Sequence, residues 1–399
     1  MRRTTLGLWA IMALGAQTGC QKSDPPKKEI VERKTAQQVT PALARTFAES
    51  FEKAAKSKDA VALNNLIDWN MLLEISTEGL DLPSQMKSGF MSGLKSTAGG
   101  GPLAAGIIQA LNAGGSYDFL KVREVNGQRR ALFRLIMPGE GGVNYHDVVL
   151  GAGSGGKVKA IDIYVYLTGE PISQTFRRLL IPMAASTGIA ARLGGEEALL
   201  VKHLDDLQVI GNAVQSGDHK TALRRYATLP KELQEEKSIQ LMRLTAAQNA
   251  NDDVLYAKAI EEVERLFPND PSLDMLLIDG YFMKKDWAKV LESVDRLDAR
   301  IGGDPYLNIM RSGVMLEKGS NDEALALGAK ALEALPELAD AHWTHLSAAL
   351  RSEDYALALK DMNTLTSKFQ VVFGDLTTNP EFAGFVKSPQ YTEWKAAHP

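Results

Sequence analysis

The amino-acid sequence predicts an α+β N-terminal domain followed by an all-α solenoid of repeated helix pairs. Three observations support this fold class. Apolar residues recur at helical spacing from about residue 35, the period becomes two between residues 117 and 168, and a period of 34 residues begins at residue 203. Helices packed on a strand meander form an α+β domain, whereas a sustained repeat of this length is typical of stacked helix pairs.

Length and composition exclude several classes of protein. A chain of 399 residues is long enough for two domains with separate cores. Its net charge is −4, from 45 basic and 49 acidic residues, which argues against nucleic acid as a partner because phosphates require a clustered positive surface. The single cysteine excludes both a disulfide framework and a cysteine-based zinc site.

The first residues have the layout of an export signal. Positively charged Met1–Arg3 precedes an apolar run, Leu6–Ala16, and the only cysteine is Cys20. This layout resembles the signal peptide of bacterial lipoproteins. The resemblance implies removal of residues 1–19, lipidation of Cys20 as a membrane anchor, and a flexible tether over residues 20–34.

Other signals stay open at this point. Gln17 stands where lipoprotein signals usually have Leu, so an ordinary secretory signal is the main alternative. Arg2 and Arg3 fit a twin-arginine signal less well, because Thr5 replaces an apolar residue. Gln21, rather than Asp, follows the cysteine and resembles the sorting pattern for the outer membrane. We therefore expect the protein on the periplasmic side of a bacterial envelope.

Residues 35–198 contain the predicted α+β domain. Two helices are expected between residues 35 and 80, and a third begins at Pro83. Asn126-Gly127 between two strand-like runs is a strong hairpin signal. Four runs of alternating residues predict a four-stranded antiparallel meander: Tyr117–Val125, Arg130–Met137, Val143–Leu150 and Val158–Leu167.

Helices followed by such a meander resemble the cone of nuclear-transport-factor-like and cystatin-like domains. The resemblance implies a concave side that binds a ligand. Its lining residues would be Arg134, His146, Asp162, Tyr164 and Tyr166. The alternative is that Arg134 and the tyrosines only cover the edge of the sheet.

No other motif predicts chemistry. The glycine-rich segment Gly151–Lys157 has the spacing of a phosphate-binding loop, but a strand-like run follows it instead of a helix, which favours a hairpin turn. His342 and His345 lie three residues apart on an expected helix, without a carboxylate at matching spacing nearby. We therefore expect no catalytic residue, no cofactor and no metal.

The C-terminal half repeats every 34 residues, and five units fit residues 203–372 without an insertion. Small or apolar residues fill four columns at this spacing. The columns are Ala222, Tyr256, Val290, Ala324 and Ala358; Tyr226, Ile260, Val294, Gly328 and Met362; Leu229, Val263, Leu297, Ala331 and Leu365; and Ile210, Leu244, Ile278, Ser312 and Leu346. This pattern resembles the tetratricopeptide repeat (TPR) family. Aromatic residues within residues 373–399 predict short helices that cap the last repeat.

The resemblance to tetratricopeptide repeats implies a groove lined by the first helix of each pair. Groove-facing residues would be Met275, Asp279, Phe282, Tyr306, Glu317, Trp343 and Arg351. Exposed Tyr, Trp and Arg are typical of protein-binding sites, although Phe282, Tyr306 and Trp343 equally fit packing between helices.

Together these features predict a non-catalytic scaffold or adaptor that binds a protein or peptide and is anchored to a membrane by lipid. The alternative is that the α+β domain binds a small ligand or catalyses a reaction, with the solenoid recruiting a partner. A third possibility is that the α+β domain only supports or dimerises the solenoid.

Overall fold

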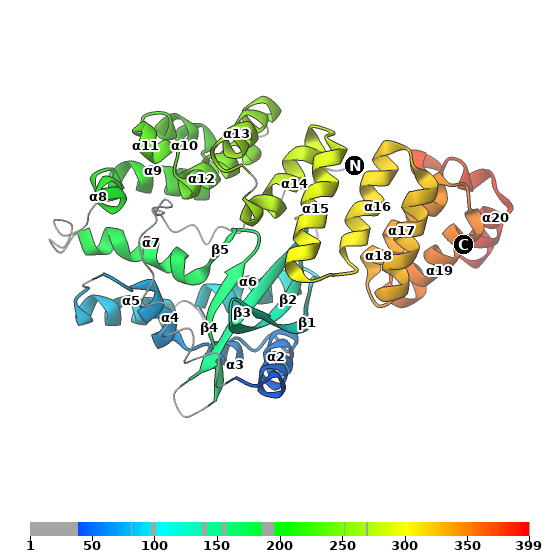
Figure 1. Ribbon diagram of the computed structural model, residues 1–399. Coiled ribbons are helices and arrows are strands. Elements are labelled where there is room, and N and C mark those ends of the chain that lie inside the picture. Colours follow the sequence, from blue (N-terminus) through cyan, green and yellow to red (C-terminus); the bar gives the residue numbers. More distant parts are fainter. Residues whose placement is uncertain are drawn as a thin grey trace. The chain divides into compact units, whose positions relative to one another are not determined.

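The computed structural model describes residues 39–80, 82–96, 101–137, 142–153, 157–185, 195–250, 252–268 and 270–398. The predicted signal peptide, Cys20 and the tether lie outside these residues. The chain forms two compact units, Met1–Leu273 and Asp274–Pro399. The first contains the α+β region and two of the helix pairs, and the second contains the other three pairs (Figure 1).

Short polar side chains begin the helices of the α+β region. Thr40, Asp59 and Asp68 each accept a hydrogen bond from a backbone N–H in the first turn of the helix that follows. The helices of this region are α2 (Pro41–Lys56), α3 (Ala60–Asn65), α4 (Trp69–Ser76), α5 (Ser84–Ser96), α6 (Gly101–Asn112) and α7 (Ile172–Ala185).

The predicted four-stranded antiparallel meander is confirmed, and a short fifth strand joins it. The strands lie in the order β1 (Ser116–Val125), β2 (Gln128–Met137), β3 (Gly142–Ala152), β4 (Val158–Val165) and β5 (Glu170–Pro171). Asn126 and Gly127 connect β1 to β2 with φ angles of 52° and 75°, as the tight hairpin requires. Two residues are too short a run to be recognised as a strand in the sequence, so β5 was not predicted.

One face of the sheet packs against helices. Helix α2 contacts β1, β2 and β4, and α6 contacts β1 and β2. The ring of Phe51 on α2 lies 5.3 Å from that of Phe133, which stacks on Tyr117 at 5.1 Å. The main core of the α+β region therefore lies between the helices and this face.

The rest of the chain consists mainly of packed helix pairs, as predicted. In the first unit they are α9 (Leu204–Gln215) with α10 (His219–Tyr226) and α12 (Lys237–Asn249) with α13 (Asp253–Leu266), beside α8 (Gly195–Lys202) and α11 (Lys231–Gln234). In the second unit they are α14 (Asp274–Met283) with α15 (Trp287–Ile301), α16 (Leu307–Lys318) with α17 (Asn321–Ala334), and α18 (Ala339–Arg351) with α19 (Tyr355–Phe369).

The 34-residue period is a period of burial. Every residue of the four columns is buried, from Ile210 to Leu365. Gly328 shows why a small residue is needed in one of them, because a Cβ at this position would lie 3.3 Å from the Cα of His345 on the next helix.

Short helices end the second unit. They are η3 (Leu376–Thr378), η4 (Pro380–Phe382), η5 (Phe385–Lys387) and α20 (Pro389–Ala397). Phe382, Phe385 and Trp394 are buried here and form one apolar cluster with Leu346 and Met362 of the last pair. The C-terminal aromatic residues thus cover the apolar face that the last pair would otherwise expose.

Candidate functional site

The residues predicted to line a groove lie on or beside the first helices of three pairs, but several of them pack inside the unit. Met275 on α14 is buried. Tyr306, at the start of α16, is also buried, and its hydroxyl donates a hydrogen bond to Asp340 at 3.3 Å. The ring of Phe282 lies 5.1 Å from that of Trp287. These three side chains therefore contribute to packing, and Asp279 beside them is only partly exposed.

The other three predicted residues are exposed. Trp343 on α18 keeps 37% of its surface exposed, which is unusual for so large an apolar side chain. Its ring lies 5.4 Å from that of Phe373, which holds one side of the indole. Glu317 on α16 and Arg351 on α18 are exposed as well. Among the predicted groove residues, the exposed side chains therefore lie on α16 and α18.

The five residues predicted to line a pocket in the α+β region do not share one site. His146 pairs across the sheet with Phe133 and faces the helices, whereas Arg134 pairs with Tyr145 on the opposite face. Tyr164 lies on that opposite face too, because it pairs with Asp147, the neighbour of His146.

His146 is a hydrogen-bonded core residue. Asn144 accepts a hydrogen bond from the backbone N–H of Leu167 through Oδ1 at 3.0 Å, so its Nδ2 donates to Nε2 of His146 at 3.2 Å. The proton of the neutral ring then lies on Nδ1, which is 3.2 Å from the hydroxyl oxygen of Tyr117. Burial lowers the pKa of His146 to about 4, and burial also raises the pKa of Tyr117.

Asp162 caps a helix. Its carboxylate accepts hydrogen bonds from the backbone N–H of Ser173 at 3.1 Å, from the hydroxyl of Ser173 at 2.5 Å, and from the backbone N–H of Ile163 at 2.8 Å. Burial raises the pKa of Asp162, which these hydrogen bonds oppose. The carboxylate therefore fixes the first turn of α7.

A small cavity touches Asp162. Its volume is about 10 Å³, room for about one water molecule. The remaining lining residues are apolar: Ile67, Trp69, Leu72, Leu103, Ile163, Ile172 and Phe176. A cavity of this size does not hold an organic ligand.

Charged residues and tyrosines occupy the opposite face of the sheet. Asp147 is 1% exposed and accepts hydrogen bonds from Arg123 at 2.6 and 3.1 Å and from Arg130 at 3.2 Å. Arg123 also donates to the hydroxyl of Tyr166 at 2.6 Å, and the ring of Tyr166 lies edge-on to Tyr164 at 5.1 Å. Arg134 forms an ion pair with Asp118 at 3.6 Å. These groups are engaged in a network that no spacing in the sequence indicates.

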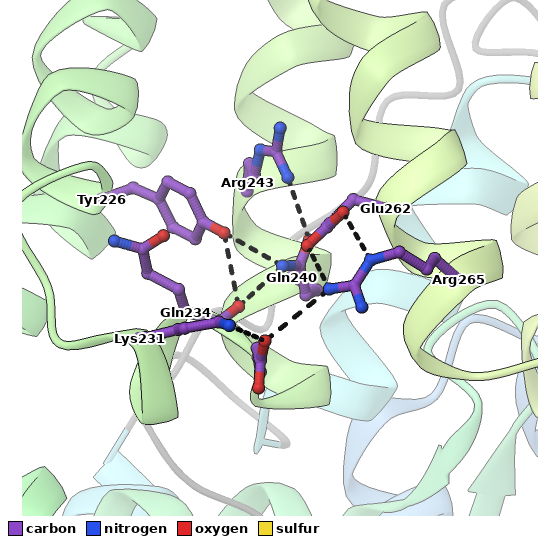
Figure 2. Close-up of polar contacts among 8 residues, drawn as sticks. Tyr226, Lys231, Gln234, Gln240, Arg243, Glu262 and Arg265 are labelled. Atoms are coloured by element: carbon purple, nitrogen blue, oxygen red, sulfur yellow. Dashed lines mark hydrogen bonds and ion pairs between the residues drawn. The ribbon is translucent and has the colours of Figure 1, made fainter.

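A second polar network joins the first helix pair to the next (Figure 2). Gln240 on α12 donates hydrogen bonds to the hydroxyl of Tyr226 at 3.0 Å and to the carbonyl of Gln234 at 2.6 Å. Arg243 lies over the ring of Tyr226 at 5.1 Å. Burial raises the pKa of Tyr226, and the nearby Arg243 opposes this shift. Gln240 is 1% exposed, so the network acts as a structural link between the pairs.

Three ion pairs extend this network toward solvent (Figure 2). Arg265 binds Glu262 through two hydrogen bonds at 2.7 and 3.0 Å. Glu235 forms ion pairs with Arg265 and with Lys231, each at 3.6 Å. Arg265 and Lys231 are paired with carboxylates, and the charge of Arg243 acts on Glu262, which makes the cluster a poor site for an anion.

Comparison with known proteins gives no relative: no family model matches the chain, and no curated protein matches it.

Among the described residues, no group of three or more His, Cys, Asp or Glu side chains is arranged to hold a metal ion. No helix within the described ranges is long and apolar enough to cross a membrane.

Proposed function

We propose that this protein is a non-catalytic scaffold, anchored through Cys20 to the periplasmic side of a bacterial envelope membrane, that binds a protein or peptide partner with its helix pairs. The proposal assigns the five pairs to the tetratricopeptide type. Binding would take place on the first helices of the pairs, at α16 and α18.

The exposed indole of Trp343 carries this proposal. Trp343 on α18 is 37% exposed, and Glu317 on α16 and Arg351 on α18 are exposed as well. An exposed tryptophan beside charged residues has the composition of a binding surface. The 34-residue spacing supports the assignment to tetratricopeptide repeats, because the second helices of the pairs begin 34 residues apart, at His219, Asp253, Trp287, Asn321 and Tyr355. Several units replace the usual small residue by Tyr or Val, as at Tyr256 and Val290, which is a departure from that family.

The alternative of a ligand-binding α+β domain has less support. Its five proposed lining residues are divided between two faces of the sheet, and the cavity beside Asp162 is about 10 Å³. We therefore place the binding function on the helix pairs.

The test compares full-length mature proteins that carry single substitutions. Trp343→Ala removes the exposed ring, and Val254→Ala is the control because Val254 is an apolar residue 63% exposed on α13. Partners captured by the wild type from detergent-solubilised envelope are purified, and their affinity for each variant is measured. We expect Trp343→Ala to weaken binding at least about tenfold and Val254→Ala to have little effect. Equal affinities for all three proteins would contradict the proposal.

The lipid anchor is tested separately. Growth with a radiolabelled fatty acid should label the wild-type protein, and Cys20→Ser should remove the label and release the protein from the membrane fraction. A labelled Cys20→Ser variant, or an unlabelled wild type, would refute the anchor without affecting the binding proposal.

A further inference from the structure

A buried carboxylate lies between two imidazole rings in the last helix pair. Asp361 on α19 is 2% exposed. Its Oδ2 is 2.6 Å from Nδ1 of His345, and its Oδ1 is 3.6 Å from Nδ1 of His342. Both histidines belong to α18 and are buried. The sequence placed the two histidines on one helix, but Asp361 joins them only in the folded pair.

Hydrogen bonding fixes where the proton of neutral His342 must lie. Its Nε2 is 3.1 Å from the carbonyl oxygen of Pro336. A carbonyl oxygen only accepts, so Nε2 carries the proton and Nδ1 of the neutral ring is a bare acceptor. That Nδ1 is buried, has no hydrogen-bond partner among the described residues, and faces a carboxylate oxygen. Two acceptors therefore face each other away from water.

Neutral imidazoles also leave the charge of Asp361 without a counter-charge. A buried carboxylate is costly unless it is hydrogen-bonded and paired with a positive group. His345 supplies one hydrogen bond through Nδ1 and carries no charge in its neutral form.

The other charged groups around the histidines are already engaged. Lys368 on α19 donates to the carbonyl of Pro336 at 3.1 Å and pairs with Glu337 at 2.6 Å, near the surface. On α17, Gly328 packs against the backbone of His345 and has no charge. Phe369 contributes an aromatic ring 5.4 Å from His342. A proton on His342 is thus the simplest counter-charge for Asp361.

We propose that His342, Asp361 and His345 form a proton-binding site that fastens α18 to α19. A proton from solvent binds Nδ1 of His342, and the imidazolium then donates a hydrogen bond to Asp361 while Nε2 keeps its bond to Pro336. The repulsive contact becomes a charge-assisted hydrogen bond. The last helix pair is therefore held more tightly in mildly acidic solution than in alkaline solution.

The site also bears on the binding surface proposed above. Trp343 lies between the two histidines in the chain, so the proton controls how firmly the helix that carries the exposed indole is held. The proton-binding site itself does not depend on the proposed function, because its test needs no partner.

The first test measures hydrogen exchange of α18 and α19 amides in the full-length protein, with wild type and His342→Gln compared at each pH. Glutamine keeps an N–H donor for Pro336 but cannot take up a proton. We expect the protection of these amides in the wild type, divided by that in the variant, to increase about tenfold as the pH falls from about 8 to about 5. In an Asp361→Asn background, the same comparison should not depend on pH. A wild-type-to-variant ratio that stays constant over this range overturns the proposal.

The second test needs no substitution and covers the case in which a variant does not fold. Nitrogen NMR of ¹⁵N-histidine-labelled wild type distinguishes an imidazolium from a neutral ring. We expect His342 to be protonated on both nitrogens at about pH 5. A neutral ring protonated only on Nε2 at that pH would overturn the proposal.

Discussion

The carboxylate of Asp354 accepts a hydrogen bond from the backbone N–H of Leu357 at 3.1 Å and so caps α19. The same position in the other pairs is Asp218, Asp252, Asp286 and Ser320, spaced by 34 residues. The three aspartates make the equivalent bond, whereas the side chain of Ser320 makes none. The second helix of each pair therefore begins at a fixed point of the repeat.

Removal of this capping side chain should lower the stability of the protein, and its addition where it is missing should raise it. Asp286→Ala should lower the free energy of unfolding by about 1 kcal/mol, because the first turn of α15 loses its acceptor. Ser320→Asp should raise it by about 0.5 kcal/mol, a gain limited by repulsion from Asp322 and Glu323 in the same turn. Denaturant unfolding measures both, and Ser320→Ala serves as the control that should change little. A loss of stability in Ser320→Asp would show that the cap cannot form there.

The residue before each of the caps Asp286, Ser320 and Asp354 has a left-handed backbone conformation. Lys285 and Glu353 have φ angles of 56° and 59°, and the equivalent Gly319 has 77°. Side chains with a Cβ adopt this conformation at a cost, so Lys285→Gly and Glu353→Gly should each stabilise the protein by about 0.5 kcal/mol. Gly319→Ala should destabilise it by about 1 kcal/mol. A lower free energy of unfolding for Lys285→Gly and Glu353→Gly than for wild type would contradict this expectation.

Acid should destabilise the α+β region through His146. Its pKa is about 4 in the folded protein, below the ordinary value of 6.5. Between these two values the unfolded chain binds a proton that the folded protein does not. The free energy of unfolding should therefore fall by about 3 kcal/mol as the pH drops from about 6.5 to about 4, with no further loss below that.

The contribution of His146 is isolated by comparison with His146→Gln, which cannot take up a proton. The difference in stability between wild type and this variant should shrink or reverse over the same pH range. A difference that is independent of pH would show that His146 does not carry the effect.

The close approach at Gly328 predicts a steric effect. A Cβ there would lie 3.3 Å from the backbone of His345, so Gly328→Val should cost about 2 kcal/mol through overpacking between α17 and α18. Gly313 on α16 is the matched control, because nothing lies within 4 Å of its Cβ position. Gly313→Ala should stabilise the helix by about 0.5 kcal/mol. Thermal unfolding compares the two, and equal midpoints would contradict the close packing.

Periodic features of this protein could be predicted because local physics repeats along the chain. Alternation of apolar residues and the Asn126-Gly127 turn predicted the meander, and the 34-residue columns predicted the helix pairs and their buried residues. The cap column from Asp218 to Asp354 has the same 34-residue spacing in the sequence, but it was not predicted. Strand β5 carried no such signal, because its two residues are held by pairing with Tyr164 and Val165.

The candidate sites depended on contacts that spacing does not encode. The sequence brought His146, Asp162 and Tyr164 together on the expectation of a concave sheet. The structure separates His146 from Tyr164, because Tyr164 pairs with Asp147 and neighbouring residues of a strand face opposite sides. It also left His342 and His345 without a carboxylate, which Asp361 supplies from the partner helix.

The sequence by itself predicted the helix pairs and the four long strands, because hydrophobic period and turns act over a few residues. Only the tertiary structure decided that Tyr306 is buried while Trp343 is exposed, and that Asp361 meets two imidazoles. Burial and charge pairing arise between residues distant in the chain. They are therefore set when the helices pack, and no local pattern fixes them.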